Sequence, residues 1–155
     1  AKALGPAIRR ALEETNAPRL QFSRYRGEIV VHKGDLLTFL PLGRFQDRYG
    51  PEPDRVRSVT TEQTSERAAT LFEELEIPVT LVGTSYSAGE LWDFGGAIKT
   101  VARADVLNVA KPGEGPFVPM DEWLHSDAID QTPPRLVVWE IPARYVRGPL
   151  DVGQP

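Results

Sequence analysis

Residues 79–90 read Val-Thr-Leu-Val-Gly-Thr-Ser-Tyr-Ser-Ala-Gly-Glu, and this stretch decides the fold. Its first four residues are apolar or β-branched, which predicts a short buried strand. The glycine at position 83 permits a sharp turn, and a helical pattern then runs from Ala88 to about Val101. A buried strand, a tight turn and a helix are the unit from which parallel sheets are built.

The same alternation continues towards the C-terminus. Residues 105–109 and 135–141 predict two further strands, and a loop rich in glycine and proline covers residues 111–116. Pro119 suits the start of a short helix through Leu124. The chain of 155 residues is close to the length of about 150 that is typical of one domain. We therefore expect a single α/β domain over residues 1–155, layered around a mainly parallel sheet.

The N-terminal half is less regular. Apolar residues at helical spacing predict a helix within residues 1–15, which either begins at residue 1 with Pro6 inside it or begins after Gly5 as N-cap. Short strands are expected at residues 28–32, 36–42 and 54–59. Thr60 and Gln63 have capping-box spacing and predict a second helix, which ends before Pro78 and whose buried face is Ala68, Ala69, Leu71, Phe72 and Leu75.

Composition excludes several classes of protein. Acidic residues outnumber basic ones by 22 to 18, so the chain lacks the overall positive charge typical of nucleic-acid binders. There is no cysteine and there are only two histidines, so we expect no disulfide, no metal site and no cofactor. No apolar run is long enough to cross a membrane, and the first residues lack the apolar segment of a signal peptide.

Ser85 is the candidate nucleophile. A serine in a tight turn between strand and helix is typical of a nucleophile elbow, but serine is also a common helix cap. Ser87 and Glu90 have capping-box spacing, so Ser87 is expected to cap the helix and to leave Ser85 for chemistry. A serine nucleophile needs a base. His32 and His125 are the only histidines, and neither has a sequence context that identifies it as that base.

Two other groups of residues follow predicted strands. A backbone N–H near Gly113 or Gly115 could approach an oxyanion, although both glycines also suit a plain turn. Trp139 and Arg144 could stack on a sugar ring and pair with its carboxylate, or they could be a core tryptophan and a surface arginine.

Four blocks of the sequence resemble the SGNH-hydrolase-like domain of the alginate O-acetyltransferase family, and residues 31–37 look like the same family. The blocks are residues 81–88, 104–110, 113–117 and 138–145. The resemblance implies a flavodoxin-like three-layer sandwich. It also implies a serine-dependent O-acetyltransferase that forms an acetyl-serine and passes the acetyl group to a hydroxyl of an exopolysaccharide such as alginate.

The resemblance also implies roles for single residues. Ser85 matches the family's nucleophile, and Gly115 is the expected contributor to the oxyanion hole. Tyr86, Trp139 and Arg144 are expected to bind the polysaccharide. The family works in the periplasm, beside a membrane machine that delivers the acetyl group, and no nucleic-acid partner is expected.

One family motif is missing from the sequence. The family carries its aspartate and histidine in an Asp-x-His-Trp motif upstream of the serine, and no Asp-x-His occurs in these 155 residues. We expect that the chain begins just after this motif, so that its first helix is cut and the domain is incomplete at the N-terminus. The alternative is a natural homologue that lost its base. Two other functions remain open, namely a non-catalytic polysaccharide-binding or assembly module and a carbohydrate acetylesterase.

Overall fold

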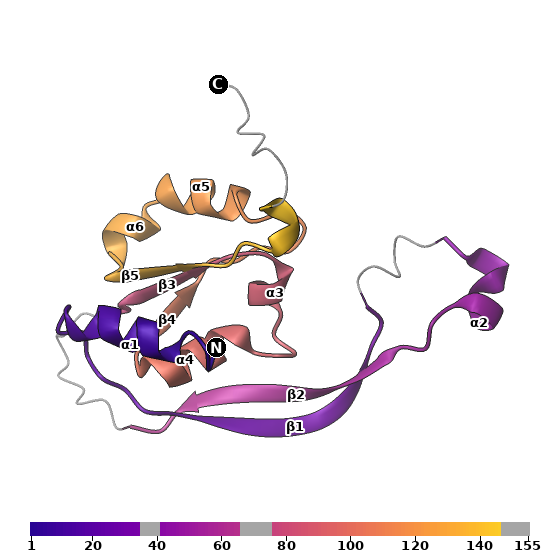
Figure 1. Ribbon diagram of the computed structural model, residues 1–155, viewed down its shortest axis with the longest axis horizontal. Helices are drawn as coiled ribbons and strands as arrows, with labels where there is room; N and C mark the ends of the chain where they lie inside the picture. Colours follow the sequence, from indigo (N-terminus) through magenta and orange to yellow (C-terminus); the bar gives the residue numbers. More distant parts are fainter. Residues whose placement is uncertain (35–40, 66–75, 147–155) are drawn as a thin grey trace.

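A three-stranded parallel sheet forms the centre of the molecule. The computed structural model describes residues 1–34, 41–65 and 76–146. The strands β3 (Val79–Val82), β4 (Val106–Asn108) and β5 (Leu136–Trp139) lie in the order β4-β3-β5. One face carries α1 (Gly5–Glu13) and α4 (Phe94–Ala102), and the other carries α5 (Val118–Leu124) and α6 (Ala128–Gln131) (Figure 1). The predicted three-layer α/β fold with a parallel sheet is confirmed.

The hydrophobic core lies between the sheet and the helices α1 and α4. All four residues of β3 are fully buried because the strand has a parallel neighbour on each side. Ile8 and Leu12, four residues apart on α1, present one apolar face to this core. The other buried members of the cluster are Val79, Leu81, Ile98, Ala102, Ala104 and Val106. This packing fixes the positions of the carboxyl ends of the strands, where the candidate site lies.

A long antiparallel ribbon extends from this body. It consists of β1 (Phe22–His32) and β2 (Asp54–Gln63), which we call the arm. One end of the arm packs against α4, and the other end reaches away from the body to η2 (Gly43–Phe45) and α2 (Gln46–Tyr49) (Figure 1). The strands predicted at residues 28–32 and 54–59 are confirmed, but both are longer than predicted.

Several predictions about helix ends are wrong. The second helix does not begin at Thr60, because residues 60–63 continue β2 and pair with residues 22–25 of β1. The first helix begins neither at residue 1 nor with Gly5 as its cap: Leu4 is the N-cap and Pro6 lies in the first turn. Ala68, Ala69, Leu71, Phe72 and Leu75, and most of the strand expected at 36–42, lie outside the described residues.

The helix expected from Ala88 to Val101 is two helices. The short α3 (Ser85–Ala88) is followed by a connector, residues 89–93, before α4 begins. Asp93 caps α4 by accepting a hydrogen bond from the Gly96 N–H, and its backbone is left-handed, with φ of 47°. After β5 the chain forms the short η3 (Ala143–Tyr145). None of the helices in the described part of the chain has the length and apolar character to cross a membrane.

Candidate active site

The connections between strands place a site at the carboxyl end of β3. The chain leaves β3 for β4 through α4 on one face of the sheet, and it leaves β4 for β5 through α5 and α6 on the other face (Figure 1). The loops that follow β3 and β4 therefore diverge, and open parallel sheets bind their ligands in the crevice beside such loops. The candidate residues after β3 and β5 meet at this edge.

Ser85 is the first residue of α3 and is partly exposed. Its neighbours Thr84 and Ser87 are only 2% and 1% exposed. Thr84, not Ser87, is the N-cap, because its Oγ1 accepts a hydrogen bond of 3.4 Å from the Tyr86 N–H. The predicted capping box of Ser87 and Glu90 is therefore wrong, since the Ser87 hydroxyl donates to a carboxylate that follows another strand. Ser85 is nevertheless free of capping, as expected.

That carboxylate belongs to Glu140, which follows β5. Its Oε2 accepts hydrogen bonds from the Thr84 N–H at 2.8 Å, from the Thr84 hydroxyl at 2.8 Å and from the Ser87 hydroxyl at 3.2 Å. A Cβ on Gly83 would lie 2.8 Å from the same oxygen, so the turn fits against Glu140 only with glycine at position 83. Sequence reasoning missed Glu140, because nothing near it in the chain indicates which residues it contacts.

Two further side chains hold the same turn. Asn108, the last residue of β4, donates from Nδ2 to the Ser87 carbonyl at 2.9 Å. Trp92, in the connector, donates from Nε1 to the Tyr86 carbonyl at 2.7 Å. The turn that carries Ser85 is thus fixed from β5, from β4 and from the connector, which keeps the serine in a defined position.

An arginine and several aromatic rings line the site next to the turn. The Arg144 guanidinium lies over the rings of Tyr86, at 5.8 Å, and Tyr145, at 5.0 Å. Phe117 makes edge contacts with Tyr145 and with Trp139. Hydrogen bonds with the hydroxyls of Tyr145 and then Tyr86 raise the pKa of Arg144, with burial opposing them, so this side chain stays cationic. Of these residues, Tyr145 and Phe117 were not expected in the site.

The glycine loop after β4 borders the same surface. Gly115 adopts a left-handed conformation with φ of 71°, and a Cβ there would lie 3.1 Å from the Tyr145 hydroxyl. The Trp139 indole donates to the carbonyl of Pro116 at 2.9 Å, so the loop is tied to β5. Within the described residues the main-chain N–H groups of Ser85 and Gly115 form no hydrogen bond. Both are therefore free to donate to an oxyanion.

The contacts described for the two histidines are with residues other than Ser85. The His32 ring packs edge-on against Trp92, with the ring centres 6.0 Å apart. His125, at the end of α5, is 77% exposed, and its Nδ1 lies 2.8 Å from the Asp121 carbonyl oxygen. Neither histidine is identified as a base. Over residues 1–34, 41–65 and 76–146, no group of three or more potential metal-ligating side chains is found.

The geometry suits acyl transfer to a sugar. A partly exposed serine stands at the start of a short helix, and its own main-chain N–H, unbonded among the described residues, can stabilise negative charge on a carbonyl oxygen. Exposed aromatic rings and a guanidinium lie next to it, and such groups stack on sugar rings and pair with carboxylates. An acidic carbohydrate is therefore the class of ligand that these side chains suit best.

Comparisons with known proteins identify the relatives of the chain. Residues 1–143 match the family model described as "SGNH hydrolase-like domain, acetyltransferase AlgX". The chain is 41% identical over 157 residues to the probable alginate O-acetylase AlgJ of Pseudomonas syringae pathovar tomato, which covers 99% of this chain and 40% of that protein. The chain thus spans less than half the length of this relative.

Two solved structures are similar to the molecule. The O-acetyltransferase domain of Pseudomonas putida AlgJ superposes with a TM-score of 0.78 at 39% identity, and the match covers 99% of this chain and 51% of that chain. AlgX of Pseudomonas aeruginosa superposes with a TM-score of 0.63 at 22% identity, over 88% of this chain and 34% of that one. The first supports both relationship and fold, and the second supports the fold alone.

Proposed function

The chain belongs to the family of the SGNH hydrolase-like domain of the acetyltransferase AlgX, and we propose that it carries the nucleophile and the acceptor-binding surface of a polysaccharide O-acetyltransferase. The observation that carries this proposal is the position of Ser85. It is the partly exposed serine of a turn in which the neighbouring Thr84 and Ser87 bond to Glu140, and it lies at the edge where parallel sheets of this kind bind ligands.

The proposed reaction has two steps. The Ser85 Oγ attacks the carbonyl carbon of an acetyl donor and loses its proton to a base, and the donor's leaving group departs with that proton to leave acetyl-serine. A hydroxyl oxygen of the polysaccharide then attacks the same carbonyl carbon and gives its proton to the base, which passes that proton to the Ser85 Oγ as its bond to the acetyl group breaks. The N–H groups of Ser85 and Gly115 stabilise the oxyanion in both steps.

We assign the base to an Asp-x-His sequence upstream of these residues in the same protein. No Asp-x-His occurs within the 155 residues, and the relatives that the chain matches are more than twice as long as the matched region. On this proposal the described part is one partial domain, and the histidine completes the site from outside it. The chain by itself then forms acetyl-serine slowly or not at all.

Tyr86, Trp139 and Arg144 are proposed to bind the acceptor. Arg144 is cationic and lies over the exposed ring of Tyr86, so a uronic acid can stack on the ring and pair its carboxylate with the guanidinium. Alginate is the proposed acceptor, because the similar proteins are named as alginate O-acetylases. The proposed location is the periplasm, with an acetyl donor delivered by a membrane machine.

The test is covalent labelling of Ser85. The protein is incubated with a chromogenic acetyl ester, both as this chain and in a form that extends upstream to include Asp-x-His, and intact mass is measured. We expect an added acetyl group on Ser85 in the longer form, and none in its Ser85→Ala variant. Ser126→Ala is the matched control, since Ser126 lies after α5 and donates to the Trp123 carbonyl.

Each outcome distinguishes the candidate functions. Acetyl-serine that passes its acetyl group to alginate supports the transferase, whereas acetyl-serine that only hydrolyses supports an acetylesterase. Labelling that persists in Ser85→Ala contradicts the assignment of the nucleophile. No labelling in either form, with alginate still bound, supports a non-catalytic binding module.

A further inference from the structure

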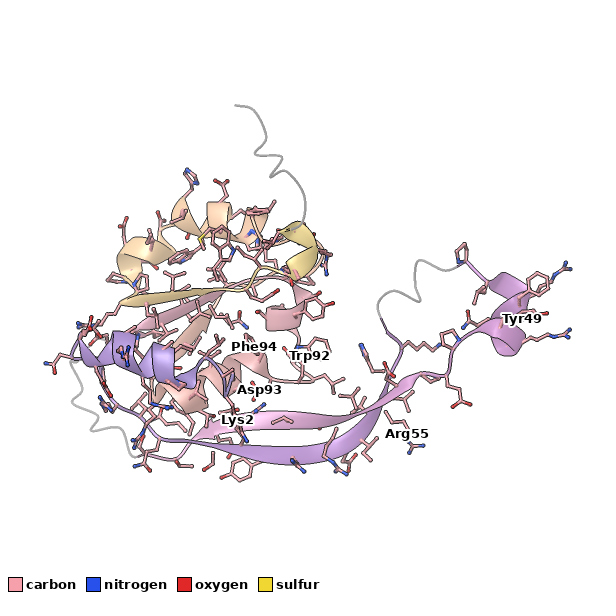
Figure 2. All side chains as sticks on the ribbon, in the orientation of Figure 1. Lys2, Tyr49, Arg55, Trp92, Asp93 and Phe94 are labelled. Atoms are coloured by element: carbon pink, nitrogen blue, oxygen red, sulfur yellow. The ribbon has the colours of Figure 1, made fainter. Side chains whose placement is uncertain are left out.

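The connector between α3 and α4 joins the arm to the site. In Figure 2, Trp92 and Asp93 lie between the body of the molecule and the arm, and Tyr49 lies in α2, beyond the arm's far end. The connector is short, yet it makes specific contacts on both sides. It is the segment through which the arm's position can affect the residues beside Ser85.

Four hydrogen bonds and one ring contact bind the connector to the arm. The Arg24 guanidinium donates to the carbonyls of Trp92 and Asp93, each at 3.2 Å. The Thr61 hydroxyl donates to the Asp93 carboxylate, and the Val59 N–H donates to the Leu91 carbonyl at 3.2 Å. The His32 ring packs edge-on against the Trp92 ring. Both strands of the arm therefore contact the connector.

The backbone of the connector is adapted to these contacts. Asp93 has φ of 47°, a left-handed conformation that costs a residue with a side chain of order 1 kcal/mol or more. A Cβ on Gly89 would overlap the indole ring of Trp92, so the ring can lie against the chain there only because residue 89 is glycine. Backbone strain that tertiary contacts maintain, together with a position that only glycine fits, indicates that the connector has one specific conformation.

On its other side the connector holds Tyr86. The Trp92 Nε1–H donates to the Tyr86 carbonyl at 2.7 Å, and the Tyr86 ring carries the Arg144 guanidinium. We propose that Trp92 is a positioning residue through which the arm holds Tyr86 and Arg144 in the arrangement that binds the polysaccharide. This rests on the proposed function, because it assumes that Tyr86 and Arg144 contact the acceptor.

The test removes one hydrogen bond and keeps the ring. Trp92→Phe deletes the donor to Tyr86 but retains an aromatic ring against His32. Trp123→Phe is the matched control, because the buried Trp123 Nε1 has no hydrogen-bond partner among the described residues. We expect Trp92→Phe to weaken binding of an alginate decamer about 2- to 10-fold, as measured by calorimetry, and Trp123→Phe to leave it unchanged.

A second pair of variants tests the role of the arm. Arg24→Met removes two hydrogen bonds to the connector and an ion pair with Asp93 at 4.0 Å, whereas Arg26→Met changes an exposed arginine of the same strand whose side chain has no described contact. We expect the first to weaken decamer binding about as much as Trp92→Phe, and the second to have no effect. Equal effects of the two arginine variants would overturn the role of the arm.

A double-variant measurement separates positioning from general structural damage. In a Tyr86→Ala background, Trp92→Phe should cause no further loss of affinity, because the ring that it positions is gone. An additive loss in that background, or unchanged binding by Trp92→Phe, would overturn the proposal. Failure of the unmodified protein to bind the decamer would also overturn the positioning role of Trp92. Measuring acetylation of Ser85 in the same protein would then show whether the proposed function had failed as well.

Discussion

Replacement of Glu140 by alanine is the most direct test of how the turn around Ser85 is held. The carboxylate accepts three hydrogen bonds on one oxygen, and their donors belong to Thr84 and Ser87, which are almost completely buried. Without the carboxylate, these donors lose their acceptor in a place that water reaches poorly. The turn must then either keep unsatisfied polar groups or move.

The magnitude follows from the number and type of these bonds. A hydrogen bond to a charged group contributes about 1.5–3 kcal/mol, but the three share one oxygen and Glu140 itself is only half-buried, so their contributions do not add in full. We expect Glu140→Ala to lower the free energy of unfolding by about 2–4 kcal/mol. For a chain of this size, that corresponds to a fall in melting temperature of roughly 5–15 °C.

The assay is urea unfolding followed by circular dichroism, with Glu140→Gln and Glu62→Ala measured in parallel. Glutamine keeps an oxygen that can accept from Thr84, so its loss should stay below about 1.5 kcal/mol. Glu62 is an exposed residue of β2 for which no partner is described, and its loss should stay within about 0.5 kcal/mol. If Glu140→Ala costs no more than Glu62→Ala, the carboxylate does not hold the turn and the reasoning is wrong.

Three further predictions concern the same site. Gly83→Ala should lower stability by about 1–3 kcal/mol in thermal unfolding, because its Cβ would meet Glu140; Gly34→Ala, whose Cβ would meet no atom within 4 Å, should not. Thr84→Ala should cost about 1 kcal/mol or more through loss of the cap, and Thr84→Ser should restore most of it, since serine can also accept from the backbone; a serine variant as unstable as alanine would contradict the capping role. Trp139→Ala should weaken alginate binding at least 5-fold in calorimetry, because a large aromatic surface is lost; unchanged affinity would remove Trp139 from the acceptor site.

Local signals in the sequence predicted the parts of the fold that depend on few distant contacts. The run from Val79 to Val82 is apolar throughout, and it forms the buried central strand. The helix from Pro119 to Leu124 is present with one additional residue at its start. The turn that carries Ser85 was also predicted, because a glycine and small polar residues between strand and helix permit little else. Resemblance to a known family then indicated which segments after the strands carry the candidate site residues.

Local signals failed where a distant partner competes for the same residues. Thr60 and Gln63 have the spacing of a capping box, but pairing with Tyr25 and Phe22 makes them part of a strand. Ser87 also has such spacing, but its hydroxyl donates to Glu140, 53 positions further along the chain. In both cases tertiary contacts outweigh a local preference of about 1 kcal/mol.

The sequence by itself therefore determined the layered α/β fold and the strand-turn-helix unit, and it singled out Ser85 as the candidate nucleophile. Only the tertiary structure decided what surrounds that serine. It brought Glu140, Asn108 and Trp92 to the turn from three different elements, and it placed Arg144 over Tyr86. The physical reason is that periodicity and turn chemistry act between near neighbours, whereas these contacts exist only after the sheet has formed and aligned the ends of its strands.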